Sequence, residues 1–481
     1  MNGMMTLQQV LAWLPGGVPH GDTGVVMERV HTDTRSLRAG DLFVALKGEH
    51  YDANQFLVQA KAGGAVAALC HPGADLASAG LPGIEVPDTK KALGQLGKAW
   101  RAQFTLPLVA VTGSNGKTTV TQMLAAILRA WKPSAMLATQ GNFNNDIGLP
   151  LTLLRLRGEH EIAALELGMN HPGEIALLAD MARPTVALVN NAQREHLEFM
   201  GTLDAVAREN GSVLCVLPQD GVAVFPHDDN FTPLWRTLAR PRRVMTFATQ
   251  PATPAGAAAA AADVTCEHLV WTDAACRVHA GTSAGPLDFT LHMAGNHNVH
   301  NALAATTCAL AVGVPLDAIR RGLESFVPVK GRSRAVRLEI DRRQIMLVDD
   351  SYNANPDSVQ AALELLASLP APRLMVLGDM GEVGDQGAMF HLQAGTQARE
   401  LGIESLFTLG ALSAHSSQQL AAARHFDTMP ALVAAVLAEL PRVASVLVKG
   451  ARFMKMEQVV EAVSARAQDR HAAAGGVPPC C

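Results

Sequence analysis

The stretch 109–119, VAVTGSNGKTT, combines residue types that can hold a phosphate group. A short apolar run ends at two glycines that bracket a Ser-Asn pair, and helix-forming residues follow. Gly113 and Gly116 allow the backbone to turn its N–H groups inward, and the N-terminus of the next helix adds partial positive charge. Lys117 can neutralise phosphate oxygens, and the Thr118 hydroxyl can bind Mg²⁺. The pattern therefore predicts a nucleotide phosphate loop.

The alternative interpretation is a glycine-rich turn whose lysine faces solvent. The usual Walker pattern has a glycine five residues before Gly116, and this chain has Val111 there. A strand, the G-S-N-G-K-T-T loop and a helix in direct succession still favour phosphate binding. The chain contains no Asn-Lys-x-Asp guanine motif, which favours ATP over GTP.

Polar side chains follow two other predicted strands. Glu166 ends the run IAALE, and His196 comes shortly after PTVALVNN. Ligands of open α/β sheets collect at the carboxyl ends of strands, so both residues are candidate Mg²⁺ ligands, although either could be a packed structural residue. The loop that begins GNFNND, at 141–146, is either a turn with a helix cap or a site for a sugar or phosphate.

One further motif matches a catalytic pattern but lacks the structural context that the pattern requires. GTSAG, at 281–285, fits the G-x-S-x-G pattern of hydrolase nucleophile elbows. That motif requires a strand, a turn and a helix, whereas here it joins two strand-like runs, ACRVHA and PLDFTLHM. We expect a hairpin turn.

Composition limits the class of protein. With 48% hydrophobic and 17% charged residues in 481, the chain predicts a globular protein of two to four domains. No apolar run reaches the ~20 residues of a membrane span, and the first residues do not resemble a secretory signal. A net charge of −5 without basic blocks argues against nucleic-acid binding. Seven scattered cysteines without C-x-x-C indicate a reducing compartment, so we expect a cytoplasmic protein.

The order of apolar runs divides the chain into three blocks, 1–104, 105–327 and 328–481. Strands alternate with amphipathic helices in the second and third blocks, which predicts an α/β fold with parallel sheets. The second block also contains a predicted antiparallel meander, and its alanine-rich stretch 251–262 is expected to be a flexible surface insertion. The third block is expected to be Rossmann-like and to end in a flexible tail.

Several motifs together resemble the Mur ligases, the ATP-dependent amide-forming enzymes of peptidoglycan precursor synthesis. They are VTGSNGKTT, LELGMN, NNAQREHLE, AGNHNVHNALAA, VKGR and VDDSYNANP, and the resemblance extends from about 31 to 460. DDSYNANPDS followed by VLGDMGEVG resembles the member that adds D-alanyl-D-alanine to UDP-N-acetylmuramoyl-tripeptide. The Asp-Asn-Pro-Arg motif of the diaminopimelate-adding member is absent. The other Mur ligases, folylpolyglutamate synthase and a nucleotide-dependent switch are the alternatives, and the third residue of the peptide, diaminopimelate or lysine, is left open.

The resemblance implies an N-terminal domain for the UDP end of the substrate, a central ATPase domain with a parallel sheet plus the meander, and a Rossmann-like C-terminal domain. It implies ATP and Mg²⁺ as cofactors, the two substrates named above as partners, and a monomer. The residues that it assigns to ATP are Gly113, Ser114, Asn115, Gly116, Lys117, Thr118, Thr119, Asn298, Asn301, Arg332 and Asp350. Those that it assigns to the substrates are Thr34, Lys47 with Gly48, Asn144, Asn145, Tyr352, Asn353 and Asn355.

For Mg²⁺ the resemblance implies Thr118, Glu166 and His196, and for catalysis Lys117, Glu166 and His196, with a general base as the alternative role of His196. One departure stands out. Many Mur ligases carry a lysine after the His-Leu-Glu segment, carbamylated in several, that helps to place a second Mg²⁺. Here the corresponding position is Asn210, so that ion would be held more weakly, or by water and Glu209.

Overall fold

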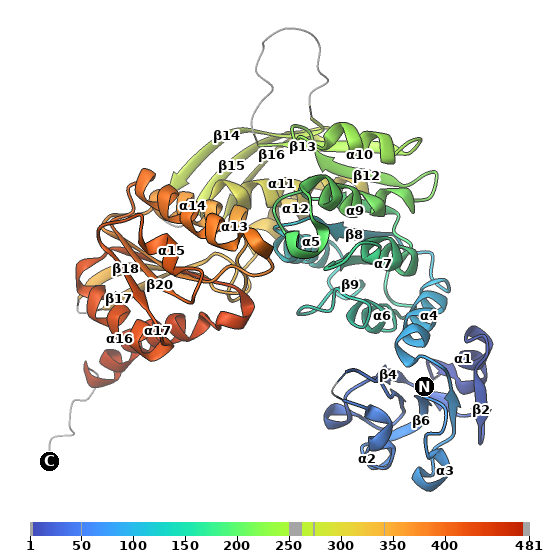
Figure 1. The fold of residues 1–481 in the computed structure, drawn as a ribbon. Coiled ribbons are helices and arrows are strands. Elements are labelled where there is room, and N and C mark those ends of the chain that lie inside the picture. The colour runs from blue at the N-terminus through green and yellow to red at the C-terminus, as the bar shows by residue number, and fades with distance from the viewer. Residues whose placement is uncertain (1–2, 50, 250–261, 273–274, 341, 475–481) are drawn as a thin grey trace, which may run out of the picture.

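The computed structural model describes residues 3–49, 51–249, 262–272, 275–340 and 342–474. The expected insertion lies outside the described residues at 251–261, as does the terminal Cys-Cys pair. Each of the three predicted blocks contains its own main sheet, and Figure 1 shows the first block at one end of the molecule and the third beside the middle block. The α/β prediction is confirmed, while the boundaries at 104 and 327 stay predictions.

The first block has a five-stranded sheet that is parallel except for the β2–β7 pair. Its strands, in spatial order, are β2 (Val18–His20), β7 (Gly83–Glu85), β6 (Ala65–Cys70), β5 (Asp41–Val44) and β4 (Arg29–His31). A small second sheet pairs β1 (Met5–Thr6) with β3 (Val26–Met27). The helices are α1 (Leu7–Trp13), α2 (Leu57–Ala62), α3 (Leu76–Ala79) and α4 (Thr89–Arg101).

The middle block contains a nine-stranded sheet. Its strands, in spatial order, are β16 (Gly285–Leu291), β15 (Ala275–Thr282), β14 (Val264–Thr272), β13 (Arg243–Ala248), β12 (Val222–Pro226), β11 (Val186–Val189), β8 (Leu108–Thr112), β10 (Ile162–Glu166) and β9 (Met136–Ala138). The β14–β15 and β15–β16 pairs are antiparallel and the others parallel. The predicted meander is therefore present, and GTSAG is the hairpin turn between β15 and β16.

Helices cover both faces of this sheet. They are α5 (Lys117–Trp131), α6 (Gly148–Leu153), α7 (Glu174–Ala182), α8 (Leu197–Met200), α9 (Leu203–Cys215), α10 (Thr232–Leu238), α11 (Asn296–Ala311) and α12 (Leu316–Glu324). Strand β8 shows why two faces are needed: Leu108 and Ala110 belong to one hydrophobic core, whereas Val109 and Val111 belong to the other. A strand buried on both faces is mostly apolar, and the phosphate loop begins where β8 ends at the carboxyl edge of the sheet.

The third block has a six-stranded sheet, parallel except for the β17–β18 pair. Its strands, in spatial order, are β17 (Arg334–Ile340), β18 (Arg343–Asp350), β22 (Ser445–Lys449), β19 (Arg373–Gly378), β20 (Ser405–Leu409) and β21 (Ala423–Phe426). The helices are α13 (Pro356–Ala367), α14 (Gly387–Glu400), α15 (Ala414–Ser417), α16 (Met429–Glu439) and α17 (Glu457–Ala474).

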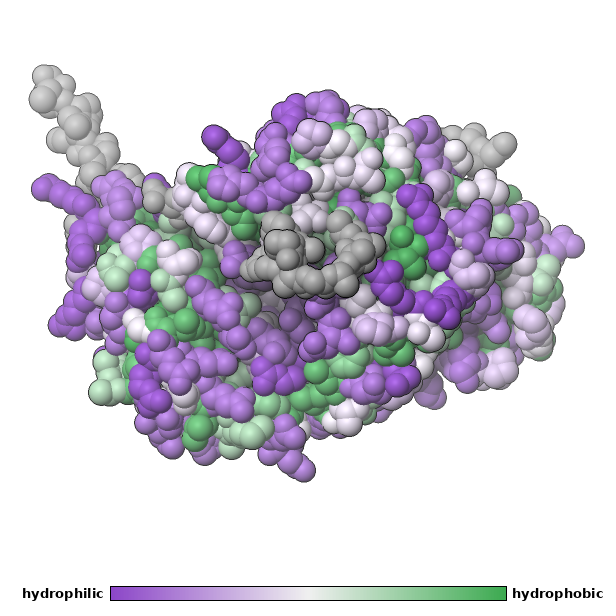
Figure 2. Space-filling model, turned by 90° about the horizontal axis from the view of Figure 1, so that it is seen from above, coloured by the Kyte–Doolittle hydropathy of each residue, from purple (hydrophilic) through white to green (hydrophobic). Residues whose placement is uncertain are grey.

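The first and middle blocks share a hydrophobic core, whereas the third block is packed mainly around separate cores. Leu93, Leu96 and Trp100 of α4 belong to the same core as β8 and α7, so the first and middle blocks share buried apolar surface. The third block has two cores, one of which also includes Ala294 of the middle block. On the face in Figure 2, hydrophobic residues form scattered patches among hydrophilic ones. Within the described residues, no helix has both the length and the apolar character that crossing a bilayer demands.

Candidate active site

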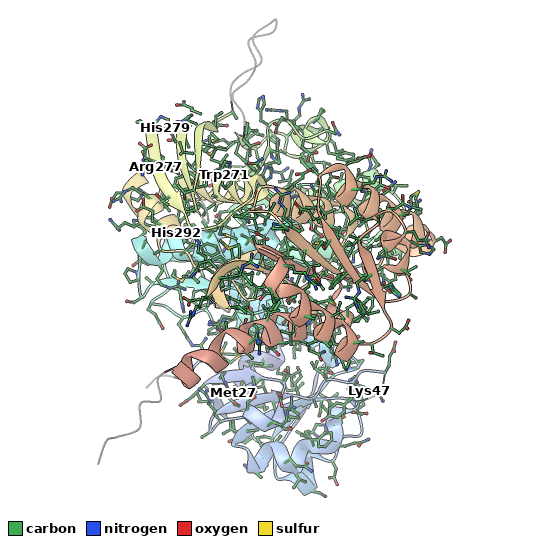
Figure 3. The ribbon with its side chains drawn as sticks, turned by 90° about the vertical axis from the view of Figure 1, so that its left-hand side faces the viewer. Met27, Lys47, Trp271, Arg277, His279 and His292 are labelled. Atoms are coloured by element: carbon green, nitrogen blue, oxygen red, sulfur yellow. The ribbon has the colours of Figure 1, made fainter. Side chains whose placement is uncertain are left out.

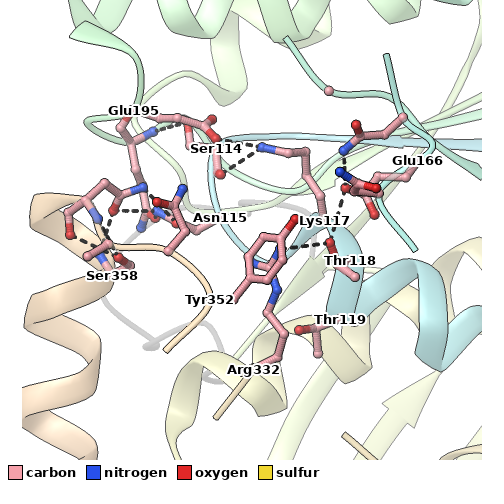
Figure 4. A pocket seen from close by; sticks show the side chains of 18 of the residues that line it. Ser114, Asn115, Lys117, Thr118, Thr119, Glu166, Glu195, Arg332, Tyr352 and Ser358 are labelled. Carbon is pink, nitrogen blue, oxygen red and sulfur yellow. Dashed lines mark hydrogen bonds and ion pairs between the residues drawn. The ribbon is translucent and has the colours of Figure 1, made fainter. Parts of the chain in front are cut away.

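One cleft of about 1300 Å³ has walls from the middle and third blocks, and Figure 4 shows part of its lining. The predicted site residues that line it are Ser114, Asn115, Gly116, Lys117, Thr118, Thr119, Asn144, Asn145, Glu166, His196, Asn298, Asn301, Arg332, Asp350, Tyr352, Asn353 and Asn355. Gly113, Thr34 and Lys47 are not among the lining residues. Gly113 lies just before the lining part of the phosphate loop, whereas Thr34 and Lys47 belong to the first block, where Figure 3 labels Lys47. The fold thus gathers most of the predicted residues in one place.

The loop between β8 and α5 requires its glycines. Gly116 has a φ of 81°, and a Cβ there would lie 2.3 Å from Asn301 Oδ1 and 2.7 Å from Asn190 Nδ2. The loop tip is held by neighbours as well: Asn115 N donates to Asn191 Oδ1 at 2.8 Å. Backbone conformation and close packing both exclude a side chain, so the loop can approach a phosphate closely.

Lys117 is folded back onto its own loop. Its Nζ donates to Gly113 O at 2.7 Å and to Ser114 O at 3.0 Å, and it pairs with Glu195 Oε1 at 2.8 Å. Its side chain is only 13% exposed. The ammonium group is therefore held at the loop by weak acceptors and one carboxylate, all of which a phosphate could replace.

Glu166 closes β10 beside Thr118, as its position in the sequence predicts. Its Oε1 accepts hydrogen bonds from Asn144 Nδ2 at 2.7 Å and from Thr118 Oγ1 at 3.2 Å, whereas its Oε2 is buried without a partner. A free carboxylate oxygen next to a hydroxyl suits Mg²⁺, which prefers oxygen ligands and takes only one or two carboxylates beside nucleotide phosphates. These two residues fit the ion, although the described residues contain no cluster of three or more His, Cys, Asp or Glu that could hold a metal alone.

His196 has different neighbours. Its Nε2 lies 3.3 Å from Glu195 Oε1, and its Nδ1 pairs with Glu382 of the third block. Burial opposes the charged form, but hydrogen bonds to Glu195 and Glu382 raise the pKa of His196 to about 9. The ring is a cation in this arrangement and has no lone pair for a metal. Its role as a ligand stays a prediction, and it requires the ring to leave both carboxylates.

Asn210 supports the phosphate loop from beneath. The residue is fully buried on α9, and its Oδ1 accepts from Thr112 Oγ1 at 2.6 Å and from Gly113 N at 2.9 Å. Its Nδ2 donates to Val206 O at 3.1 Å. The amide oxygen and nitrogen each have hydrogen-bond partners, and the side chain is uncharged. Glu209 accepts instead from the backbone N–H groups of Gly173 and Ile175, at the start of α7.

Replacing Asn210 with alanine should lower the free energy of unfolding by about 3 kcal/mol, because the buried Gly113 N–H and Thr112 hydroxyl both lose their acceptor. Urea denaturation followed by circular dichroism measures the change. Gln103→Ala, at an exposed position, serves as the control and should stay within about 0.5 kcal/mol. Equal stabilities of the two variants would contradict this account of Asn210.

The third block contacts the loop directly. Asn355, which also caps α13, exchanges side-chain hydrogen bonds with Asn115 at 3.0 and 3.3 Å. Arg332 Nη2 donates to Thr118 Oγ1 at 3.3 Å, and its guanidinium lies 4.0 Å from the centre of the Tyr352 ring. The loop therefore meets side chains that are more than two hundred residues away in the sequence.

One ion pair spans this junction, and a second lies beside it within the third block. Arg194, from the loop after β11, contacts both carboxylate oxygens of Asp357, with Nη2 2.7 Å from Oδ1 and its backbone N 2.6 Å from Oδ2. Lys449, which is 3% exposed, pairs with Asp350 Oδ2 at 2.5 Å, while Ser333 N donates to Asp350 Oδ1 at 2.9 Å. Asp350 thus ties the segment that enters the third block to β22, and Arg194 ties α13 to the middle block.

Sequence reasoning missed four of these residues: Glu195, Arg194, Asp357 and Lys449. The rule that selected Glu166, a polar residue at the end of an apolar strand, could also have found Lys449. The predicted adenine contacts have protein partners here: Asn298 donates to Ala294 O, and Asn301 accepts from Asn190. Their contact with a nucleotide stays a prediction.

Comparison with known families agrees with this geometry. The model of the Mur ligase middle domain matches residues 111–309, that of the Mur ligase glutamate ligase domain matches 333–452, and that of the Mur ligase family catalytic domain matches 27–101.

Individual proteins match over almost the whole length. UDP-N-acetylmuramoyl-tripeptide–D-alanyl-D-alanine ligase of Escherichia coli K12 is 40% identical over 95% of this chain and 98% of its own. The enzyme of that name from Haemophilus influenzae is 36% identical over 92% and 94%. A crystal structure of MurF from Acinetobacter baumannii superposes with a TM-score of 0.86, at 33% identity over 96% of this chain and 98% of that one. The resemblance found in the motifs is confirmed: the chain belongs to the Mur ligase family.

Proposed function

We propose that the chain joins D-alanyl-D-alanine to UDP-N-acetylmuramoyl-tripeptide at the expense of ATP, releasing ADP and phosphate, in the synthesis of the peptidoglycan precursor. The observation that carries this proposal is a phosphate loop in a cleft whose opposite wall, from another block, already contacts Thr118 through Arg332. The relatives named above carry this activity in their names. The enzyme acts in the cytoplasm as a monomer.

The reaction divides into two transfers. An oxygen of the tripeptide carboxylate bonds to the γ-phosphorus as the bond to ADP breaks, which gives an acyl phosphate. The amino nitrogen of D-alanyl-D-alanine then bonds to the acyl carbon, phosphate leaves and the nitrogen loses a proton. Both transfers bring negative groups together, so positive charge and fixed N–H donors at the loop are what the protein must supply.

In this proposal Lys117 leaves Glu195 and extends to the ATP phosphates, beside the N–H groups of residues 113–119. Thr118 and Glu166 hold Mg²⁺, whose bound charge would screen the phosphates from the incoming carboxylate. Asn144 holds Glu166 in place through its 2.7 Å hydrogen bond. Arg332, Asp350, Asn298 and Asn301 form the nucleotide side of the cleft, and His196 is the third Mg²⁺ ligand or a base for the amine.

The residues that we assign to the substrates come from all three blocks. Thr34 and Lys47, in the first block, face the UDP end of the substrate, and Asn145 lies toward its peptide. Tyr352 and Asn353 are the residues proposed for the dipeptide. Asn355 has a supporting role as well, because its amide already pairs with Asn115. Contact between the third block and the loop also excludes water, which would otherwise hydrolyse the acyl phosphate.

The testing experiment measures ADP release from the full chain with ATP, Mg²⁺ and UDP-N-acetylmuramoyl-tripeptide, with and without D-alanyl-D-alanine, and identifies products by mass spectrometry. We expect ADP and a UDP-linked pentapeptide only when the dipeptide is present. Tripeptides with diaminopimelate and with lysine are run in parallel to identify the acceptor. Equal ADP release with and without the dipeptide would instead indicate an ATPase or a switch. Product formation with a single amino acid in place of the dipeptide would indicate a different ligase.

Reversing the Arg194–Asp357 pair tests the contact between blocks. Arg194→Asp and Asp357→Arg should each lower kcat/KM for ADP formation by roughly tenfold, because each places like charges together at the junction. The double variant should recover most of the loss. Recovery is incomplete because the backbone N of Arg194 loses its carboxylate acceptor.

The matched control is the exposed Arg208–Asp204 pair on α9, which contacts neither the loop nor the third block through these side chains. Reversing it should leave kcat/KM unchanged. If the Arg194–Asp357 double variant were no more active than the single variants, the pair would not act as a unit.

A further inference from the structure

Two carboxylates in the cleft have an oxygen that the protein leaves without a partner. They are Glu166 and Glu195, and in each it is Oε2 that is buried and unpaired. The residues are 2% and 8% exposed. A buried carboxylate oxygen without a hydrogen bond destabilises the fold, so a native protein that keeps two of them in one cleft has a use for them.

The other acidic residues that line the cleft in the described part of the chain are occupied, in the sense that none has a buried oxygen without a partner. Each carboxylate pairs with a cation or accepts backbone N–H groups: Asp146 with Lys90, Glu174 with the N–H of Asn170 and His171, Asp229 with the N–H of Phe231, Asp350 with Lys449, Asp357 with Arg194 and Glu382 with His196. Glu195 is therefore distinguished from them by the same feature as Glu166.

The two glutamates contact consecutive residues of the loop. Glu166 accepts from Thr118, and Glu195 pairs with Lys117, so the carboxylates lie on the two sides of the point where the loop becomes α5, as Figure 4 shows. Both Lys117 and His196 bind the same oxygen of Glu195, Oε1. These contacts fix the carboxylate while leaving Oε2 unused, which is how neighbouring groups orient a metal ligand.

We propose that Glu195 binds, through Oε2, a divalent cation that enters the cleft with ATP. This inference rests on the proposed function, because the nucleotide phosphates supply the remaining ligands, as is usual for Mg²⁺. When Lys117 moves to the phosphates, Glu195 loses one of its two cationic partners and gains the metal ion. The amide of Asn210 is neutral and already hydrogen-bonded to the protein, and it cannot provide this charge.

The carboxylate is charged in the resting protein. Burial opposes ionisation, but Lys117 and His196 together hold the pKa of Glu195 below its usual range. The simpler explanation is that Glu195 only neutralises Lys117 before a nucleotide binds. The two explanations differ in what they predict for metal binding: a ligand contributes to cation affinity, whereas a mere counterion competes with the nucleotide.

The test uses the full chain, a non-hydrolysable ATP analogue with a methylene bridge, and Mn²⁺ as the probe, with free Mn²⁺ measured by electron paramagnetic resonance. Glu195→Gln should weaken Mn²⁺ binding to the analogue complex by roughly tenfold or more. Glu195→Asp, which keeps the charge, should lose less. Glu174→Gln, the same substitution at an occupied acid of the same cleft, is the control and should bind Mn²⁺ as the wild type does.

Calorimetric titration of the analogue without divalent cations gives a second readout, in which Glu195→Gln should bind as well as the wild type or better. Wild-type Mn²⁺ affinity in Glu195→Gln would overturn the inference and leave the counterion explanation. If that variant fails to fold, Glu195→Asp decides, and unchanged Mn²⁺ affinity there overturns the inference equally. Failure of the wild-type chain to bind the analogue at all would overturn the proposed function itself.

Discussion

Replacing Lys117 with methionine is expected to lower kcat for ADP formation by roughly 10³-fold, the loss that follows removal of one preorganised charge from a transition state. Lys117 is the first residue of α5, and its ammonium already lies within the loop, 2.7 Å from Gly113 O. Methionine keeps most of the side-chain volume, so packing around the loop is retained. Steady-state kinetics with saturating substrates measure the effect.

The control for this variant is Lys98→Met. Lys98 is an exposed lysine on α4 that pairs with Asp180, and its loss should leave kcat unchanged. Methionine at 117 also leaves Glu195 without an ammonium partner, so circular dichroism must show that the variant is folded at the assay temperature. A folded Lys117→Met enzyme that keeps more than a tenth of the wild-type kcat would remove Lys117 from the transition state.

The second large effect concerns stability. Arg101, the last residue of α4, is 4% exposed, and its guanidinium donates to the carbonyl oxygens of Ala182, Phe104, Leu106 and Arg183. Burial, with a smaller contribution from Arg183, lowers its pKa to about 10, so it remains charged at neutral pH. Arg101→Met should lower the free energy of unfolding by roughly 4 kcal/mol, because several buried carbonyls lose their donor at once.

Thermal unfolding by calorimetry measures this loss. Arg208→Met is the matched control, since Arg208 is an exposed arginine with one surface carboxylate partner, and it should change stability by less than about 0.5 kcal/mol. If Arg101→Met were as stable as the control, the guanidinium would not join α4 to the end of α7 and the start of β8 in the way these hydrogen bonds indicate.

Features that depend on neighbours in the sequence could be predicted. The phosphate loop needs only a strand, two glycines, a lysine and a helix in succession, and all of them are found as expected. Glu166 was found because parallel strands end at a common edge, and the GTSAG hairpin because two strand-like runs flank it. The alternation of strands and helices was enough for the α/β class.

The contacts across the cleft could not be predicted in this way. Asn115 and Asn355 are 240 residues apart, and Arg194 and Asp357 are 163 apart, so no local pattern relates them. Nor does a sequence show that Glu195 faces Lys117, because the direction of an irregular loop depends on the packing around it. Asn355 is an example. It lines the cleft as predicted, but its amide group already forms hydrogen bonds in a helix cap and to Asn115.

The way in which the third block meets the rest of the chain has a consequence for its motion. The contacts described are mostly ion pairs and hydrogen bonds, and Ala294 and Leu197 are middle-block residues that pack against its core. Separating the blocks therefore exposes little hydrocarbon to water, and the hydrophobic effect does little to oppose it. Attraction between charges does oppose it, and the screening length falls from ~10 Å at 0.1 M salt to ~3 Å at 1 M. We therefore expect higher ionic strength to weaken the attraction between the blocks, although less for the partly buried Arg194–Asp357 pair, whereas temperature and urea act first on the cores.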